Sequence, residues 1–113
     1  MEQHYKLFRV RELAGDDQEF IVALAQTFLE EVPSDAERLK KAVAEKNYHE
    51  AYQAAHKMKP TVDLFELGVL QDLIEVQDWG KFTKTDVDIT DKLEIVLASV
   101  EQASNELRSD FNL

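Results

Sequence analysis

The sequence lacks cysteine, has few turn-forming residues and contains no long hydrophobic run. The absence of cysteine excludes disulfides, thiolate metal sites and a cysteine nucleophile in this chain. Its three glycines, Gly15, Gly68 and Gly80, are too scattered for a phosphate-binding glycine-rich loop or a hairpin-rich β fold. No apolar run approaches the ~20 residues of a membrane span, and the first residues lack the layout of a signal peptide. We therefore expect an all-α, cytoplasmic protein without membrane association.

Positive charge is also scarce. The 113-residue chain has 13 lysine and arginine residues against 23 aspartate and glutamate residues, which gives a formal charge of −10 at pH 7. Nucleic-acid binding depends mostly on basic surfaces, so we expect a protein partner and no nucleic acid. The length is that of one domain, and no linker or repeat divides it. We expect residues 1–113 to form a single domain.

Two helices are predicted in the first half of the chain. The capping box Asp16-x-x-Glu19 marks the start of the first helix, and Pro33 is expected to end it. A second capping box, Ser34-x-x-Glu37, marks a helix that is expected to end at Asn47 in the left-handed conformation. The apolar residues at helical spacing in these segments are Phe20, Ile21, Leu24, Ala25, Phe28, Val32, Ala36, Leu39 and Val43.

A third helix is predicted from the capping pattern Asn47-x-x-Glu50 onward. Its tight connection to the second helix requires the two to be antiparallel neighbours. Pro60 has no N–H to donate to the carbonyl of His56, so we expect this helix to kink or restart near His56. The apolar pattern then continues to Trp79-Gly80, where the glycine is expected to stop the helix.

The remaining segments complete the predicted fold. Residues 81–87 are expected to be a connection, and a last helix is expected to begin at Asp88 or Thr90 and to run to the C-terminus. The first dozen residues fit either a short packing helix or an ordered arm. Together these elements predict an up-and-down antiparallel four-helix bundle whose third helix is bent, with a short extra N-terminal helix left open.

One histidine lies on the polar side of the predicted third helix. At about 100° per residue, one apolar stripe is formed by Ala51, Ala55, Met58, Val62 and Phe65. The opposite side holds His49, Gln53, His56, Pro60 and Asp63. Lys59 follows His56 by three residues, close enough for its ammonium to reach a group carried on the imidazole. This arrangement of an exposed imidazole beside a cation indicates that the imidazole of His56 carries an anionic group.

A metal site fits the histidines less well. Metal ligands in helix bundles often follow Glu-x-x-His spacing, whereas Met1, Lys46 and Gln53 stand three residues before the three histidines. We expect no metal ion on this chain. The serines of the last helix have no histidine near them in sequence, so no hydrolase triad is predicted.

Three segments resemble the histidine-containing phosphotransfer (HPt) family. They are Phe28-Leu-Glu-Glu-Val-Pro33, Leu39-x-x-Ala42-x-x-x-x-Asn47-Tyr48 and Ala54-Ala-His-Lys-Met-Lys59, within a match that spans about residues 13–75. The last segment is similar to the family's Ala-His-x-Leu-Lys motif, in which the histidine accepts a phosphoryl group and the lysine stands next to it. The resemblance implies that His56 is the phosphoacceptor and that Lys59 stabilises the phosphoryl charge.

Two positions depart from the family pattern. The family usually has glycine directly after the motif lysine and another glycine farther along, where this chain has Pro60 and Glu66, with Gly68 displaced. Proline also puts no long side chain over the imidazole. The run from His56 to Pro60 is in addition faintly similar to the phosphoacceptor box of dimerising sensor kinases. That alternative ranks second, because the acidic residue after the histidine is missing.

The resemblance implies a carrier in a phosphorelay. His56 is expected to accept a phosphoryl group from an aspartate of one receiver domain and to yield it to another. The expected partners are receiver domains of response regulators and of hybrid histidine kinases. No ATP site is present, so the chain is not expected to be an enzyme, and Mg²⁺ is expected on the receiver rather than here. The expected docking residues are His49, Tyr52, Gln53, Lys57, Pro60 and Asp63.

A helical adaptor or decoy that docks receivers or other proteins without phosphorylation is the alternative from a different class. Lys59 beside an exposed histidine argues against it. No long coiled-coil seam is present, so we expect a monomer.

Overall fold

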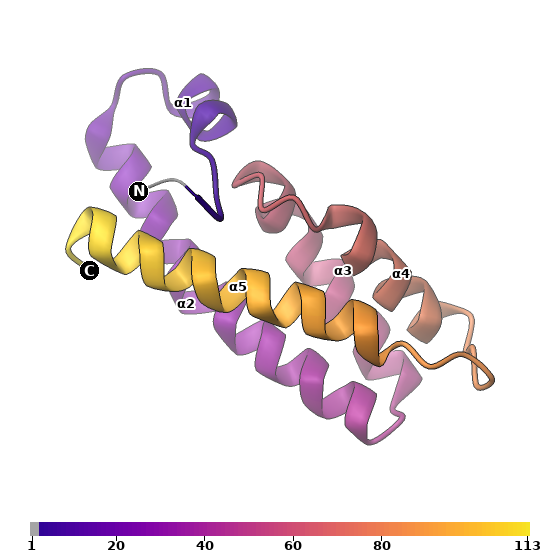
Figure 1. Ribbon diagram of the computed structural model, residues 1–113. Helices are drawn as coiled ribbons and strands as arrows, with labels where there is room; N and C mark the ends of the chain where they lie inside the picture. The colour runs from indigo at the N-terminus through magenta and orange to yellow at the C-terminus, as the bar shows by residue number, and fades with distance from the viewer. Residues whose placement is uncertain (1–2) are drawn as a thin grey trace.

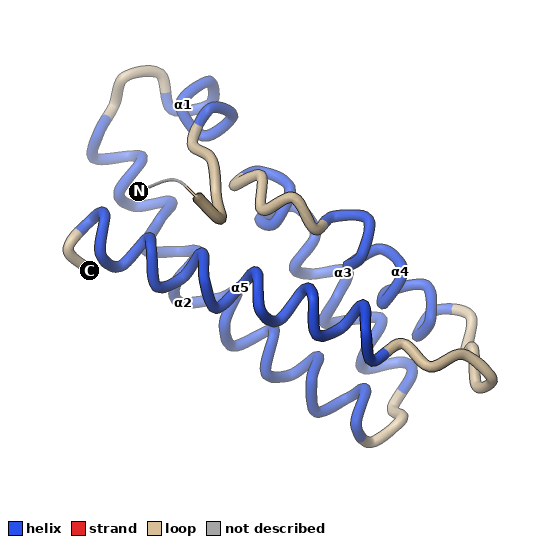
Figure 2. The backbone as a smooth tube through the Cα atoms, viewed as in Figure 1, coloured by secondary structure: helices blue, strands red, loops and turns tan. Residues whose placement is uncertain are grey.

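Five helices make up most of residues 3–113, the part of the chain that the computed structural model describes (Figure 1). They are α1 (Phe8–Ala14), α2 (Gln18–Ala44), α3 (Tyr48–Leu64), α4 (Leu70–Lys81) and α5 (Thr90–Phe111). Residues 3–113 contain no strand, so the all-α prediction is confirmed (Figure 2). Within this range, no helix combines the length and the apolar character needed to cross a bilayer.

The four longer helices pack around one elongated core. α2 contacts α3 and α5, α4 contacts the same two helices, and the short α1 packs against α2. The molecule measures 47 × 22 × 20 Å, with α1 at one end and the connection between α4 and α5 at the other (Figure 1). The apolar faces meet in one continuous cluster, in which the rings of Phe28 and Phe65 lie 5.0 Å apart.

The expectation that Pro33 ends a helix is wrong. α2 continues through Pro33 for 27 residues, and the Ser34 capping box does not start a new helix. A proline in a helix interior costs about 3 kcal/mol. Burial on both sides of it offsets that cost, because Val32 and Leu39 are both buried against the core and a large apolar side chain contributes about 1.5–3 kcal/mol. Packing along the whole helix therefore overrides the local break.

The chain instead turns where no break was expected. α3 also continues through its proline, Pro60, and does not restart there, but it ends at Leu64. The amide of Glu66 donates to the carbonyl of Asp63 at 3.1 Å, and the amide of Leu67 donates to the carbonyl of Val62 at 3.2 Å. These are the two bonds of a Schellman motif, which closes a helix C-terminus. The bent third helix of the prediction is thus two helices, joined by residues 65–69.

The predicted ends of the other helices are correct to within one or two residues. Asp17, not Asp16, caps α2 by accepting from the amide of Phe20 at 3.2 Å. The left-handed residue after α2 is Lys46 rather than Asn47. Asn47 caps α3 as predicted, by accepting from the amide of Glu50 at 3.2 Å. α4 runs one residue past Gly80, and α5 begins at Thr90, one of the two predicted starts.

The N-terminal segment is both an ordered arm and a helix. Residues 3–7 precede α1, and the amide of Lys6 donates to the carbonyl of Phe65 at 2.8 Å. The hydroxyl of Tyr5 donates to the carboxylate of Asp110 at 2.6 Å, and the ring of His4 pairs with Glu106. Two opposing effects act on the pKa of Glu106. Burial favours a higher pKa, but hydrogen bonds from the His4 ring and from two backbone amides outweigh burial and hold the pKa below its ordinary value.

Four helices are followed by a residue other than glycine that has positive φ. These residues are Lys46, Glu66, Thr83 and Asn112, and Thr83 (φ 49°) is the β-branched one. An L-residue in this conformation is strained by roughly 1–2 kcal/mol, whereas glycine is not. We expect Thr83→Gly to raise the free energy of unfolding by about 1 kcal/mol, measured by urea denaturation. Thr85→Gly, in the same loop at an ordinary φ, is the control and should not stabilise. Equal effects of the two variants would contradict this account.

Candidate functional site

The polar side of α3 forms the candidate site. The predicted apolar stripe is confirmed, since all five of its residues, Ala51, Ala55, Met58, Val62 and Phe65, are buried. His49, Gln53, His56 and Pro60 are exposed on the other side, and Asp63 is half-buried. The core thus fixes which side of α3 faces outward, and His56 lies in the middle of that side.

His56 has an aromatic neighbour and a cation one helical turn away on either side. The ring of Tyr52 stacks on the imidazole, with 5.7 Å between the ring centroids and 29° between the planes. Lys59 is half-buried and makes no ion pair or hydrogen bond within residues 3–113. At i+3 its Cβ lies about 5–6 Å from that of His56, so its ammonium can reach an anion on the ring.

Lys57 points elsewhere. Its Nζ lies 3.1 Å from Oδ1 of Asp35 and 4.0 Å from Oε1 of Glu31, both on α2. A second pair, Arg38 with Glu50, links the same two helices, with 2.9 Å from Nη2 to Oε1. The hydrogen bond from Arg38 holds the pKa of Glu50 below its ordinary value. Lys57 therefore helps to hold α3 against α2, and its charge is already matched by a carboxylate.

α4 packs unusually close to the turn that carries Tyr52. A Cβ atom at Gly80 would lie 2.5 Å from the carbonyl oxygen of Tyr48 and 2.7 Å from the backbone nitrogen of Tyr52. Only a residue without a side chain permits this approach. The prediction that Gly80 stops the helix misses its role, which is close packing of α4 on α3.

Two further groups near this surface were missed from the sequence. Arg9 of α1 pairs with Asp63, with 2.8 Å from Nη1 to Oδ1, which brings α1 beside the exposed side of α3. Gln77 of α4 is 7% exposed, and its Oε1 has no hydrogen-bond partner within residues 3–113. It precedes Gly80 by one turn, which in antiparallel packing is the level of the Tyr52–His56 turn. No local pattern marks either residue, because both contacts join separate helices.

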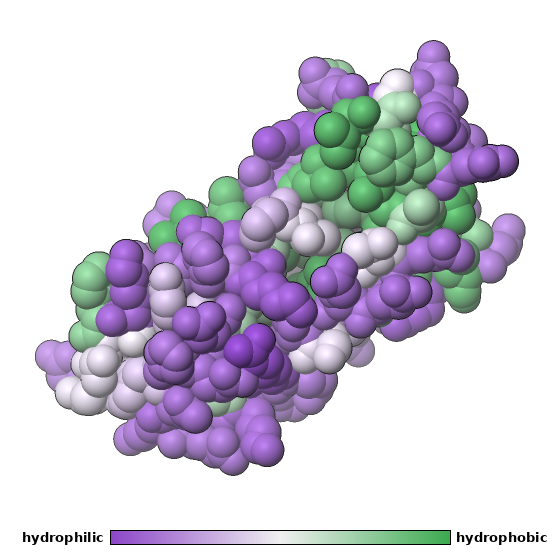
Figure 3. Space-filling view, turned by 180° about the vertical axis from the view of Figure 1, so that it is seen from behind, coloured by the Kyte–Doolittle hydropathy of each residue, from purple (hydrophilic) through white to green (hydrophobic). Residues whose placement is uncertain are grey.

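Large apolar side chains are exposed at the α1 end of the molecule. Phe8 is 69% exposed, Leu13 61% and Phe20 41%, although Phe20 had been predicted to join the apolar stripe of its helix. Figure 3 shows hydrophobic side chains gathered at this end, while most of the rest of that face is hydrophilic. We call Phe8, Leu13 and Phe20 the apolar patch. Exposed apolar surface marks a protein-binding site where it is contiguous and large, whereas single exposed apolar side chains are common.

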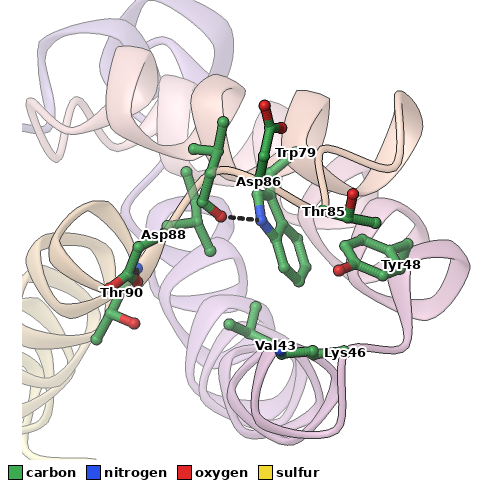
Figure 4. Close-up of a pocket in the computed structure, with 10 residues that line it drawn as sticks. Val43, Lys46, Tyr48, Trp79, Thr85, Asp86, Asp88 and Thr90 are labelled. Atoms are coloured by element: carbon green, nitrogen blue, oxygen red, sulfur yellow. Dashed lines mark hydrogen bonds between the residues drawn. The ribbon is translucent and has the colours of Figure 1, made fainter.

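A cleft of about 420 Å³ lies at the opposite end, between the end of α2 and the loop before α5 (Figure 4). The rings of Tyr48 and Trp79 lie 4.4 Å apart there, and Nε1 of Trp79 donates to the carbonyl of Val87 at 2.9 Å. Asp88 accepts from the amide of Thr90 at 2.9 Å. These groups fasten the loop, and none of the lining residues is a histidine. No group of three or more His, Asp or Glu residues in range 3–113 could hold a metal ion.

The close contact at Gly80 has a measurable consequence. We expect Gly80→Ala to lower the free energy of unfolding by about 1–3 kcal/mol, because the added methyl group meets backbone atoms that cannot rotate away. Alanine's better helix propensity, about 1 kcal/mol, offsets only part of this. Gln71→Ala, at an exposed position of α4, is the control for urea denaturation and should be near neutral. An unchanged midpoint for Gly80→Ala would mean that α4 can shift at no cost.

Comparison of the chain with protein-family models, with curated proteins and with solved structures gives no match. The site is therefore defined by its own geometry. It consists of an exposed imidazole on His56, a stacked ring on Tyr52 and an ammonium on Lys59 that has no partner among residues 3–113, on a helix that is held on both sides. An imidazole in this setting is open to a large partner and can act as a nucleophile.

Proposed function

We propose that the protein is a phosphorelay carrier of the HPt type, and that its four longer helices form an up-and-down four-helix bundle. The observation that carries the proposal is that the exposed His56 and Lys59 lie one turn apart on the outward side of a packed helix, and that the Lys59 ammonium has no partner in the described part of the chain. A histidine that only filled the core would be buried, and one that only decorated the surface would need no stacked ring and no neighbouring cation. The resemblance of residues 54–59 to the HPt motif supports the same function.

The reaction is a reversible transfer of a phosphoryl group between an aspartate and His56. A neutral ring nitrogen of His56 attacks the phosphorus of a receiver's phosphoaspartate. The N–P bond forms, the P–O bond to the aspartate breaks, and the carboxylate leaves with the electron pair. The proton on the second ring nitrogen stays there. Reversal on another receiver completes the relay, so this chain stores the phosphoryl group.

Phosphoryl transfer depends on in-line positioning and on stabilisation of charge on the equatorial oxygens. Most of that charge stabilisation is expected from the Mg²⁺ of the receiver. Lys59 supplies the share that comes from this chain, since the charge of Lys57 is engaged with Asp35.

The docking surface for the receiver extends from His56 along α3 toward α1. Pro60 and Asp63 continue the exposed side of α3, and the pair of Asp63 with Arg9 connects it to the helix that carries Phe8. In this proposed surface His56 lies in the middle of α3, and Phe8 of the apolar patch lies toward the α1 end. His49 and Gln53 extend the same surface in the other direction.

His56→Gln is expected to abolish phosphoryl uptake from a receiver charged with acetyl phosphate, while helicity and thermal stability change little because the side chain is exposed. The measurement is the acid-labile, alkali-stable phosphoryl group on the protein. His49→Gln is the matched control, since His49 is exposed on the same side of α3 and should not be needed. Uptake that survives in His56→Gln would contradict the assignment, and receiver binding without any uptake in the parental protein would favour an adaptor.

Lys59→Ala is expected to slow transfer about fivefold with little loss of receiver binding. The ammonium acts mainly when phosphoryl charge is present, and its direct interaction in a hydrated site is roughly 1 kcal/mol. Lys57→Ala is the matched control, because its charge is already paired with Asp35 and it should transfer at nearly the parental rate. If Lys59→Ala transfers as fast as the parental protein in rapid-quench measurements, the role given to Lys59 is wrong.

A further inference from the structure

An exposed imidazole on a helix is free to rotate unless something holds it. Rotation about the second side-chain torsion of histidine has only a broad, roughly two-fold preference. In this protein the ring of Tyr52 lies against that of His56, with a centroid separation of 5.7 Å and an interplanar angle of 29°. This distance is within the 4.5–7 Å range of favourable offset stacking. Tyr52 precedes His56 by four residues, so the two rings share one side of α3.

Tyr52 is held by its surroundings, whereas His56 is not. The side chain of Tyr52 is half-buried and lines a small cleft with Gly80, Lys81 and Thr83 of the α4 end. Its backbone is in direct contact with α4, since a Cβ at Gly80 would lie 2.7 Å from the Tyr52 nitrogen and 3.2 Å from its Cα. The imidazole of His56 is exposed and makes no side-chain hydrogen bond within residues 3–113.

We propose that Tyr52 is a positioning residue for His56. Its ring, fixed by α4, holds the imidazole in one orientation and keeps one ring nitrogen directed toward the incoming receiver. This inference rests on the proposed function. A stacked pair favours the contact by roughly two- to tenfold over the released ring, and transfer requires the nucleophile to stand in line with the bond that breaks. Loss of the ring should therefore slow transfer by a similar factor without changing the chemistry.

The first measurement needs no phosphoryl group. In proton and nitrogen NMR spectra of the free protein, the carbon-bound protons of the His56 imidazole should be shifted upfield by the ring current of Tyr52, relative to those of the exposed His49. Tyr52→Phe should keep this shift, and Tyr52→Leu should remove it. Gln53→Leu, a matched change at the neighbouring exposed position, should leave it unchanged. Circular dichroism checks that all three variants stay folded.

The second measurement is the rate of transfer from a phosphorylated receiver. We expect Tyr52→Leu to be two- to tenfold slower than the parental protein, and Tyr52→Phe to lie within twofold of it. A parental rate for Tyr52→Leu, or an unchanged imidazole spectrum in that variant, would overturn the proposal. Equal losses for phenylalanine and leucine would also overturn it, because they would assign the effect to the hydroxyl group. If the parental protein takes up no phosphoryl group, the proposed function fails, and the spectra alone decide whether Tyr52 orients His56.

Discussion

The surroundings of His56 depend on the contact of two helix backbones at Gly80. Without a side chain there, α4 approaches α3 closely enough to touch the backbone of Tyr48 and Tyr52. Charge pairs hold the other side of α3, where Lys57 and Glu50 bind Asp35 and Arg38 of α2. Together with the buried stripe of α3, these contacts fix the rotation of the helix about its axis. Its outward strip of residues is therefore as well defined as its buried one.

These two kinds of contact differ in their energies. The Lys57–Asp35 pair is half in solvent on the lysine side, and such pairs contribute at most about 1 kcal/mol. Backbone contact at Gly80 is a steric constraint, and it is not weakened by salt or by a change of pH. The charge pairs thus select which residues of α2 lie opposite α3. The position of α4 is set by the steric fit of its backbone against α3 at Gly80.

Helical spacing predicted the all-α fold class and the exposed side of α3 from the sequence, because burial follows the helical period directly. It placed all five residues of the α3 stripe correctly, from Ala51 to Phe65. The predictions were wrong mainly about where helices end. Pro33 looked like an end and is not one, because the burial of a long helix face outweighs a local cost. The true turns after α2 and α3 use Lys46 and Glu66 at positive φ, where glycine would have given a signal.

The candidate site was predictable only in part, for a related reason. The exposure of His56 and the nearness of Lys59 follow from positions along one helix. The pairing of Lys57 with Asp35 and the approach of Gly80 to Tyr52 depend on which residue of a neighbouring helix lies across the gap. Spacing along the chain carries no information on that. The Tyr52–His56 stack lies between these cases, since the i, i+4 spacing allows it but does not require it.

The connection before α3 and the connection after α4 differ in how much added chain length they can accommodate. Between α2 and α3 only three residues reverse the chain, and Asn47 both donates to the carbonyl of Ala42 and caps α3. An added residue there would move the histidine-bearing turn along the molecule. The loop before α5 is exposed from Phe82 to Asp88, and the hydrogen bond from Trp79 to the Val87 carbonyl ties it to α4. Changes in chain length, whether by evolution or by insertion of a reporter peptide, can accumulate there while the geometry around the imidazole stays intact.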